Sequence, residues 1–195
     1  TLAFPQTPWK SLWHLGGHDF LPNGDAVLCT FEGEVWVVSG IDETLLNLRW
    51  RRFASGLSQP LGLKVVEGKI NVLGRDQLTR LHDLNNDGEA DYYEAFSRAY
   101  KTPVGGHDYL TGLETDAQGR YYFASGVLGI NRISADGKTA EVLATGLRNP
   151  NGLAVGPKGE VIAGAQEGDW TAASWLTELT PGGHYRHGVP RPGPL

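Results

Sequence analysis

Short runs of β-branched and aromatic residues recur along the chain, and no segment combines a helical period with capping residues. Four times, a Gly is followed six or seven residues later by a second Gly and then by such a run. The second Gly stands where a hairpin turn requires a positive φ, as in Pro-Asn-Gly-Asp at 22–25. Each copy is therefore predicted to open with a β-hairpin. The copies are Gly17 to Gly24 with the run 26–29, Gly62 to Gly68 with 70–73, Gly112 to Gly119 with 121–124, and Gly152 to Gly159 with 161–163.

Further strands follow each hairpin. Third strands are predicted at 34–38, 78–81, 130–133 and 176–179, and fourth strands in three copies at 51–57, 92–96 and 141–147. The turn glycines recur at intervals of 44, 51 and 40 residues, close to the length of a propeller blade. The sequence thus predicts an all-β protein, a single β-propeller domain over 1–195 with about four four-stranded blades. The predicted blades are 14–57, 58–100, 107–147 and 148–185.

The predicted ring is incomplete. The fourth copy runs into a Pro- and Gly-rich end at 182–194 without a closing strand, and an open sheet edge invites unwanted pairing. The chain also contains no Met, even at position 1, which leads us to expect a processed or partial product. We therefore expect a missing remainder, or a partner chain or second copy, to complete the propeller.

Composition excludes several classes of protein. The 195 residues are 40% apolar and 20% charged, as in ordinary globular proteins, and no stretch approaches the ~18 consecutive apolar residues of a membrane span. The net charge of −5 argues against nucleic acid as a partner. The basic group Arg49, Arg51 and Arg52 is interpreted as a solvated edge strand. Cys29 has no second Cys to pair with and is predicted to be a buried, unreactive thiol.

The segment 83–94 matches the calcium loop D-x-[DN]-x-[DN]-G-x₅-E, with Gly88 at the sharp turn. Calcium takes six to eight oxygen ligands, and a short loop supplies them by placing oxygen-bearing residues at alternate positions. Two other interpretations stay open: an acidic turn without metal, or a metal that only staples the insertion joining the second and third blades. No flanking helices are predicted, which disfavours a calcium sensor. The predicted ligands are Asp83, Asn85, Asp87, Glu89 through its backbone carbonyl, Asp91 and Glu94.

Several motifs resemble those of one enzyme family. Arg148-Asn149-Pro150 within 146–155, followed by Gly-Gly-His-Tyr at 182–185, resembles the signature of soluble glucose and sorbosone dehydrogenases. These are six-bladed propellers that hold pyrroloquinoline quinone and calcium on one face. The segment 107–109, ahead of 112–123, is similar to the one that places their general-base His. The sequence of 56–63, with the calcium loop after it, also resembles that of the membrane-bound dehydrogenase-type propellers of planctomycete-like bacteria.

The resemblance implies roles for three residues. Arg148 would bind a carboxylate of the quinone, Asn149 would hydrogen-bond a quinone oxygen, and His107 would take the proton of a sugar hydroxyl. Each of the three also has a structural alternative. Arg148 would pair with a carboxylate between blades, Asn149-Pro150 would only form a turn, and His107 would be a hydrogen-bonded residue of the rim. The later blades of the family have no counterpart here, and 166–170, where the family binds calcium, offers no clear ligand set.

The remaining candidates are weaker. Four histidines are interpreted as loop residues, and two tryptophans either stack on a sugar or pack between blades. Two functions stay open: a quinoprotein-like sugar (aldose) dehydrogenase or part of one, periplasmic or secreted, and a non-catalytic, calcium-stapled module that binds a protein or glycan. The residues are His14, His18, His184 and His187, and Trp170 and Trp175.

Overall fold

In the computed structural model, the described residues (4–8, 10, 12–102, 104, 108–167 and 173–185) form β-strands and no helix. No helix of this part of the chain could therefore span a membrane. The fifteen strands are β1 (Leu15–Phe20), β2 (Ala26–Thr30), β3 (Val35–Ser39), β4 (Arg49–Ala54), β5 (Gly62–Val66), β6 (Lys69–Leu73), β7 (Leu78–His82), β8 (Tyr92–Ser97), β9 (Leu110–Thr115), β10 (Tyr121–Ser125), β11 (Gly129–Ile133), β12 (Ala140–Ala144), β13 (Leu153–Val155), β14 (Val161–Ala165) and β15 (Trp175–Glu178).

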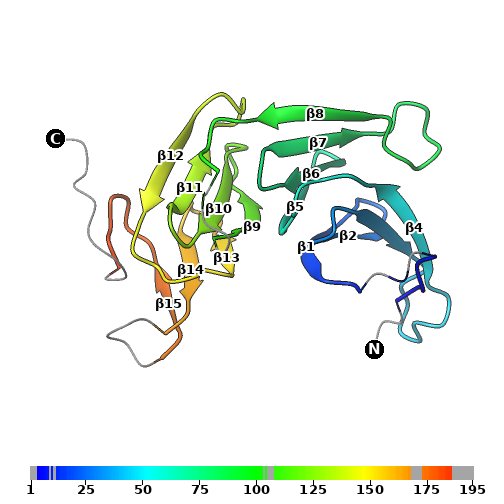
Figure 1. Cartoon of the computed structure of the whole chain (residues 1–195), viewed down its shortest axis with the longest axis horizontal. Coiled ribbons are helices and arrows are strands. Elements are labelled where there is room, and N and C mark those ends of the chain that lie inside the picture. The colour runs from blue at the N-terminus through cyan, green and yellow to red at the C-terminus, as the bar shows by residue number, and fades with distance from the viewer. Residues whose placement is uncertain are drawn as a thin grey trace.

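The strands form four antiparallel meanders in chain order. The first three sheets have four strands each, β1–β4, β5–β8 and β9–β12, and the fourth has β13–β15. The sheets follow one another around an axis, with the first and fourth at the two ends of an open ring (Figure 1). The predicted all-β propeller of about four blades is confirmed, and the ring is not closed. Arg49, Arg51 and Arg52 lie exposed on β4, the outermost strand of the first sheet.

The glycine that opens each repeat lets the inner strands β1, β5 and β9 approach closely. A Cβ atom on Gly17 would lie 2.2 Å from the amide nitrogen of Leu63, and one on Gly62 would lie 2.8 Å from the carbonyl oxygen of Gly112. Both distances are shorter than van der Waals contact, so only Gly fits. A Cβ on Gly152 would meet nothing within 4 Å, because no described sheet follows the fourth.

Apolar side chains fill the three interfaces between successive sheets. Alternation along each strand sends every second side chain to one face of its sheet. The first interface holds Val27, Cys29 and Val72, the second Leu73, Leu113 and Phe123, and the third Tyr122, Ile130 and Ala163. Cys29 is fully buried, as predicted, and this burial raises the pKa of its thiol to about 12.

The outer face of the first sheet is covered by other side chains, whereas the outer face of the fourth sheet is exposed. On the first sheet, Trp36 is covered by Trp13, with ring centroids 4.9 Å apart, and Phe4 packs on Trp13. On the fourth sheet, Ile162 is 41% exposed and Leu176 is 79% exposed. An uncovered apolar face of this kind is typical of a surface that another element covers.

Candidate functional site

The segments that lead into the inner strands meet at one end of the ring and, together with the β10–β11 turn and the residue after β14, enclose a pocket of about 470 Å³. They bring together residues from all four sheets, because the inner strands start at the same end of the axis. We call this pocket the mouth. It is lined by Leu15, Gly16, Leu61, Asp108, Tyr109, Thr111, Gly126, Asn149, Pro150, Asn151 and Gln166.

Asn149, a predicted cofactor ligand, lies in the wall of the mouth. Its φ of 39° is in the left-handed region, which Asn adopts more readily than most residues. The side-chain amide of Asn149 donates to Oε1 of Gln166 over 3.2 Å, and the backbone amide of Gln166 donates to the carbonyl of Arg148 over 3.1 Å. The turn before β13 is thereby tied to the end of β14.

Arg148 is directed elsewhere. Its guanidinium donates to the backbone carbonyl of Glu167, and its side chain does not line the mouth. The structure therefore places Asn149 in the pocket and leaves the guanidinium of Arg148 on the neighbouring backbone. His107, the predicted base, lies outside the described residues, as do His187 and Trp170.

A buried carboxylate in the mouth was missed by the sequence analysis. Asp108 is only 5% exposed and accepts a hydrogen bond from the hydroxyl of Ser125, whose oxygen lies 3.0 Å and 3.1 Å from the two carboxylate oxygens. A Cβ on Gly126 would lie 3.1 Å from Oδ1 of Asn149 and 3.4 Å from Oδ1 of Asp108, so both side chains flank the same glycine. The only signal in the sequence was that Asp108 follows His107.

The Gly-Gly-His-Tyr segment has a packing role. His184 forms a parallel bridge with Thr145, and Nδ1 of His184 lies 3.0 Å from the Thr145 hydroxyl. The Tyr185 hydroxyl accepts from the amide of Thr180, and its ring lies 6.0 Å from that of Trp175. The segment thus ties the fourth sheet to the end of β12, and Trp175 packs against it.

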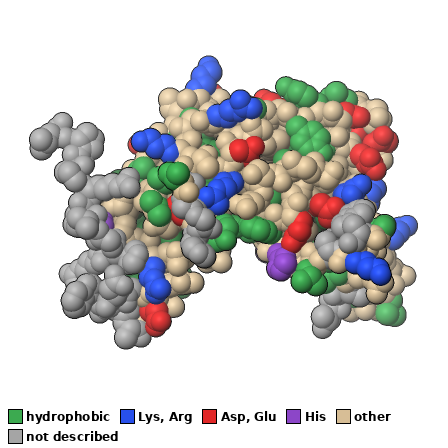
Figure 2. Space-filling view, in the orientation of Figure 1, with side chains coloured by type: hydrophobic (Ala, Val, Ile, Leu, Met, Phe, Trp, Pro, Cys, Tyr) green, Lys and Arg blue, Asp and Glu red, His purple; other side chains and the backbone are tan. Residues whose placement is uncertain are grey.

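The predicted calcium loop connects β7 to β8. The amide of Gly88 donates to Oδ2 of Asp83 over 2.8 Å, and the amide of Asp87 donates to Oδ1 of Asn85 over 2.9 Å. The side chain of Asp91 accepts from the amide of Leu84 over 2.7 Å. Oδ1 of Asp83 is buried and has no hydrogen-bond partner. Figure 2 shows acidic side chains gathered over this loop.

Glu94, the last predicted ligand, is not in the loop. It lies on β8, where Oε2 is 2.7 Å from Nε2 of His82 and 3.9 Å from a guanidinium nitrogen of Arg80. Within the described residues, no three His, Cys, Asp or Glu side chains are already arranged around a metal position. Within the loop, the side-chain amide of Asn85 donates to Asp87 over 3.0 Å and to Asp91 over 3.4 Å, whereas Glu94 lies on the sheet.

The expectation that this insertion joins the second and third blades is wrong, because the loop connects β7 to β8 within the second sheet. The loop also contacts the first sheet. The amide of Ala90 donates to the carbonyl of Phe53 over 2.7 Å, and Arg51 donates to the carbonyl of Asp87 over 3.4 Å. The amide of Ser55 donates to the hydroxyl of Tyr93 over 3.1 Å. The insertion lies within the second sheet and forms hydrogen bonds with β4 and the residue after it in the first sheet.

Solved structures of similar fold include sugar dehydrogenases. A glucose dehydrogenase-type oxidoreductase of Thermus thermophilus is 21% identical, with a TM-score of 0.69 over 94% of this chain and 68% of its own. The PQQ-bound form of an aldose sugar dehydrogenase from Streptomyces coelicolor is 18% identical, with a TM-score of 0.68 over 90% and 62%. The apo form of the soluble aldose sugar dehydrogenase of Escherichia coli is 15% identical, with a TM-score of 0.64 over 89% and 62%.

Neither a protein-family profile nor a curated protein sequence matches the chain. At these levels of identity the likeness shows a shared fold. The chain has the β-propeller fold of the glucose and aldose sugar dehydrogenase structures and spans about two thirds of their length.

Proposed function

We propose that this chain is a quinoprotein-like sugar (aldose) dehydrogenase propeller, or part of one, which oxidises a sugar hydroxyl with bound pyrroloquinoline quinone and calcium. The observation that carries the proposal is the mouth, where Asn149 lies beside a buried carboxylate. A PQQ-bound structure among those of similar fold supports the choice of cofactor. We also keep the prediction of a periplasmic or secreted location.

The residues of the mouth fit a planar ligand that is rich in oxygen acceptors. Asn149, Asn151 and Gln166 bring three side-chain amides to the pocket, and amide nitrogens donate to quinone oxygens. A bound quinone would supply the acceptor for the hydride of the sugar. A carboxylate of the cofactor needs a cation, and we propose that Arg148 supplies it by exchanging the carbonyl of Glu167 for the ligand. His107 remains our proposed base.

Calcium is proposed for the loop between β7 and β8. The buried Oδ1 of Asp83 without a partner supports this, because an unpaired carboxylate oxygen costs free energy that a cation would offset. Asp83, Asn85, Asp87 and Asp91 would supply side-chain oxygens and Glu89 its backbone carbonyl. Glu94 would join them only by leaving His82. Because the loop contacts β4, bound calcium would fasten the second sheet to the first.

A calcium titration tests the loop. Calcium is expected to raise the unfolding temperature of the chain, and Asp83→Asn is expected to abolish that rise. Asp136→Asn is the matched control, because Asp136 lies exposed in a turn of the third sheet. An equal rise in wild type and Asp83→Asn, or no rise in wild type, would exclude the site.

The open end of the ring supports a further blade or partner. Ile162 and Leu176 lie on the face of the fourth sheet opposite its contact with the third. We propose that this face is covered by the remainder of a longer protein, by a partner chain or by a second copy.

The competing function is a non-catalytic, calcium-stapled module that binds a protein or glycan. The observation in its favour is that the Arg148 guanidinium is held by a backbone carbonyl and does not face the mouth. Activity separates the two functions. The chain reconstituted with calcium and pyrroloquinoline quinone is expected to reduce a dye when an aldose is added.

Arg148→Ala should remove this activity, whereas Arg132→Ala should not, since Arg132 pairs with Glu141 on the third sheet. No reduction by the wild-type chain, or equal activity of both variants, would refute the assignment of Arg148. Absence of quinone binding would favour the module.

A further inference from the structure

Four Asn or Asp residues of the chain, all of them exposed, are followed directly by Gly. The pairs are Asn23-Gly24, Asp87-Gly88, Asp136-Gly137 and Asn151-Gly152. At such a pair the backbone amide of the Gly can attack the side chain before it, because Gly has no Cβ to obstruct the approach. The attack needs a Gly nitrogen that is not hydrogen-bonded to an acceptor and a side chain that is not held by other groups.

In three of these pairs the Gly amide is already hydrogen-bonded. The acceptors are the carbonyl of Leu21 for Gly24, the carbonyl of Ser134 for Gly137 and Oδ2 of Asp83 for Gly88, over 2.9, 2.9 and 2.8 Å. A nitrogen that donates in this way must first lose its hydrogen bond, which raises the barrier to attack. These three pairs are therefore expected to react slowly while the chain is folded.

The amide of Gly152 has no acceptor among the described residues. Strand β13 begins only after Gly152, whereas β1 and β9 include the corresponding Gly17 and Gly112. The amide of Gly17 donates to Sγ of Cys29 over 3.1 Å, and that of Gly112 donates to the carbonyl of Leu61 over 3.3 Å. A Cβ on Gly152 would meet nothing within 4 Å, so its surroundings are open. The nitrogen of Gly152 is thus available as a nucleophile.

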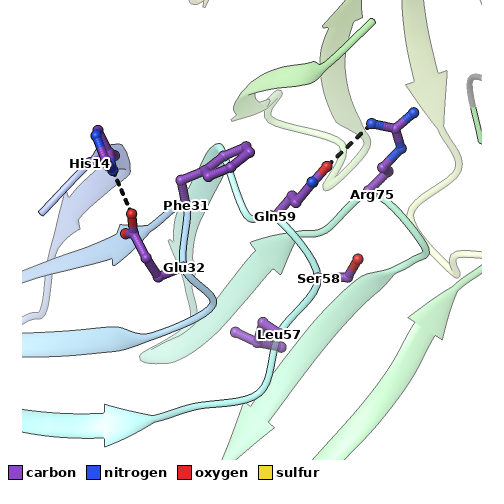
Figure 3. Close-up of a pocket in the computed structure, with 7 residues that line it drawn as sticks. All are labelled: His14, Phe31, Glu32, Leu57, Ser58, Gln59 and Arg75. Atoms are coloured by element: carbon purple, nitrogen blue, oxygen red, sulfur yellow. Dashed lines mark hydrogen bonds and ion pairs between the residues drawn. The ribbon is translucent and has the colours of Figure 1, made fainter. Parts of the chain in front are cut away.

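The side chain of Asn151 lines the mouth and also has no hydrogen-bond partner in the described part of the chain. Other amide side chains in pockets are held in place. Asn149 donates to Gln166 over 3.2 Å in the mouth. In a second pocket, between the first and second sheets, Gln59 accepts from Arg75 over 3.2 Å (Figure 3). Of the four pairs, only the one at 151–152 combines an unheld side chain with an unheld Gly amide.

We infer that Asn151 is a site of spontaneous deamidation in the folded chain, through a succinimide formed with Gly152. The Gly152 nitrogen loses its proton to hydroxide and attacks Cγ of Asn151. The new C–N bond closes a five-membered ring, the bond from Cγ to Nδ2 breaks, and Nδ2 takes a proton from water and leaves as ammonia. Water then adds to one of the two ring carbonyls and opens the ring to aspartate or isoaspartate. Water is the only co-reactant, and no group is oxidised or reduced.

The product changes the charge of the mouth. A side-chain amide that donates hydrogen bonds becomes a carboxylate, in a pocket that already contains the buried carboxylate of Asp108. Both charges then oppose an anionic ligand. This consequence, unlike the reaction itself, rests on the proposed function: a chain in which Asn151 has deamidated should retain less quinone.

Peptide mapping by mass spectrometry tests the reaction. The folded chain is kept at mildly alkaline pH, and samples taken over days are digested and analysed for the mass gain of deamidation and for isoaspartate. Asn151 is expected to react ~10-fold or more faster than Asn23, which corresponds to about 1.4 kcal/mol in activation free energy. Asn23 is the matched control within the same chain. It is exposed and precedes Gly, but its side chain is hydrogen-bonded to Asp25 and the amide of Gly24 to Leu21.

The same measurement in urea separates structure from sequence, because both Asn residues precede Gly and should react at similar rates once the chain is unfolded. Asn151→Gln should remove the signal at 151, since a Gln side chain would have to close a larger ring, whereas Asn23→Gln should leave it unchanged. Equal rates at both sites in the folded chain, a faster reaction at Asn23, or no reaction at Asn151 while the unfolded chain reacts would overturn the inference. Failure of the proposed function is a separate result: Asn151 then deamidates as described, but neither fresh nor aged chain retains quinone.

Discussion

Replacing Gly62 by Ala tests the close approach of the inner strands. The added Cβ would lie 2.8 Å from the carbonyl oxygen of Gly112 and 2.9 Å from the Cβ of Leu113. Neither neighbour is the flexible end of a side chain, so the second and third sheets must move apart. Overpacking of this kind destabilises by about 1–3 kcal/mol. The movement would also lengthen the hydrogen bond from the Gly112 amide to the Leu61 carbonyl. Such a hydrogen bond contributes about 1 kcal/mol to the free energy of unfolding.

One effect acts in the opposite direction. Ala restricts the unfolded chain more than Gly does, which stabilises the folded state by about 0.4–1 kcal/mol. The net loss expected for Gly62→Ala is therefore about 1–3 kcal/mol in the free energy of unfolding. Gly164→Ala is the matched control. Its Cβ would lie 3.3 Å from Cδ2 of the exposed Leu176, a side chain that can turn away, and 4.0 Å from the carbonyl oxygen of Gly152, which is an ordinary contact.

Urea unfolding of wild type and both variants, followed by tryptophan fluorescence, measures the difference. Gly62→Ala should unfold at a clearly lower urea concentration than wild type. The free energy of unfolding of Gly164→Ala should stay within about 1 kcal/mol of the wild-type value. Equal stability of Gly62→Ala and wild type would show that the backbones at the axis are not in close contact. Equal loss in both variants would show that the effect is general to Gly replacement.

Three further predictions concern buried groups. Cys29, with its pKa raised to about 12 by burial, should react with a thiol reagent at mildly alkaline pH only as the chain unfolds, and rapid labelling of the folded chain would contradict this. Burial alone would raise the pKa of Asp116, but hydrogen bonds from Arg120 and Tyr122 outweigh it and hold the pKa below 3.8. The stability that Asp116 contributes should therefore be complete above pH 3.8 and be lost as the pH falls through the lower folded-state pKa. In urea unfolding at a series of acid pH values, the free energy of unfolding should fall less steeply with decreasing pH for Asp116→Asn than for wild type. The same pH dependence in both would refute the role of Asp116. Asn71→Leu should cost about 1–3 kcal/mol in urea unfolding, because the fully buried Asn71 accepts from Arg80 and from Tyr121 of the next sheet, and an unchanged midpoint would exclude that link.

Strand positions could be predicted because each depends on local residues. The run 121–124 has β-branched or aromatic residues beside a turn glycine, and β10 covers 121–125. The three-stranded fourth sheet was also indicated, because the sequence shows no fourth run after 176–179. Asn149 was predicted to bind a ligand from its motif, and the structure places its side chain in the mouth.

Contacts between sheets could not be predicted in the same way. Nothing near Glu94 in the sequence indicated that cross-strand pairing would bring it to His82, or that the calcium loop would reach Phe53 of the first sheet. His14, interpreted as an ordinary loop residue, meets Glu32 only because the β2–β3 turn folds beside the entry to β1. The burial of Asp108 likewise depends on Ser125, seventeen residues away. Propeller topology, and not local pattern, creates these contacts.

Equilibrium dialysis of pyrroloquinoline quinone against the chain in calcium buffer tests the proposed role of the mouth most directly. The wild-type chain should retain one quinone per molecule. Asn149→Asp should retain much less, because it places a negative charge beside Gln166 and Asp108, whereas Asn23→Asp, in the distant β1–β2 turn, should bind as wild type does. No retention by the wild-type chain, or equal retention by both variants, would contradict a quinone site in the mouth.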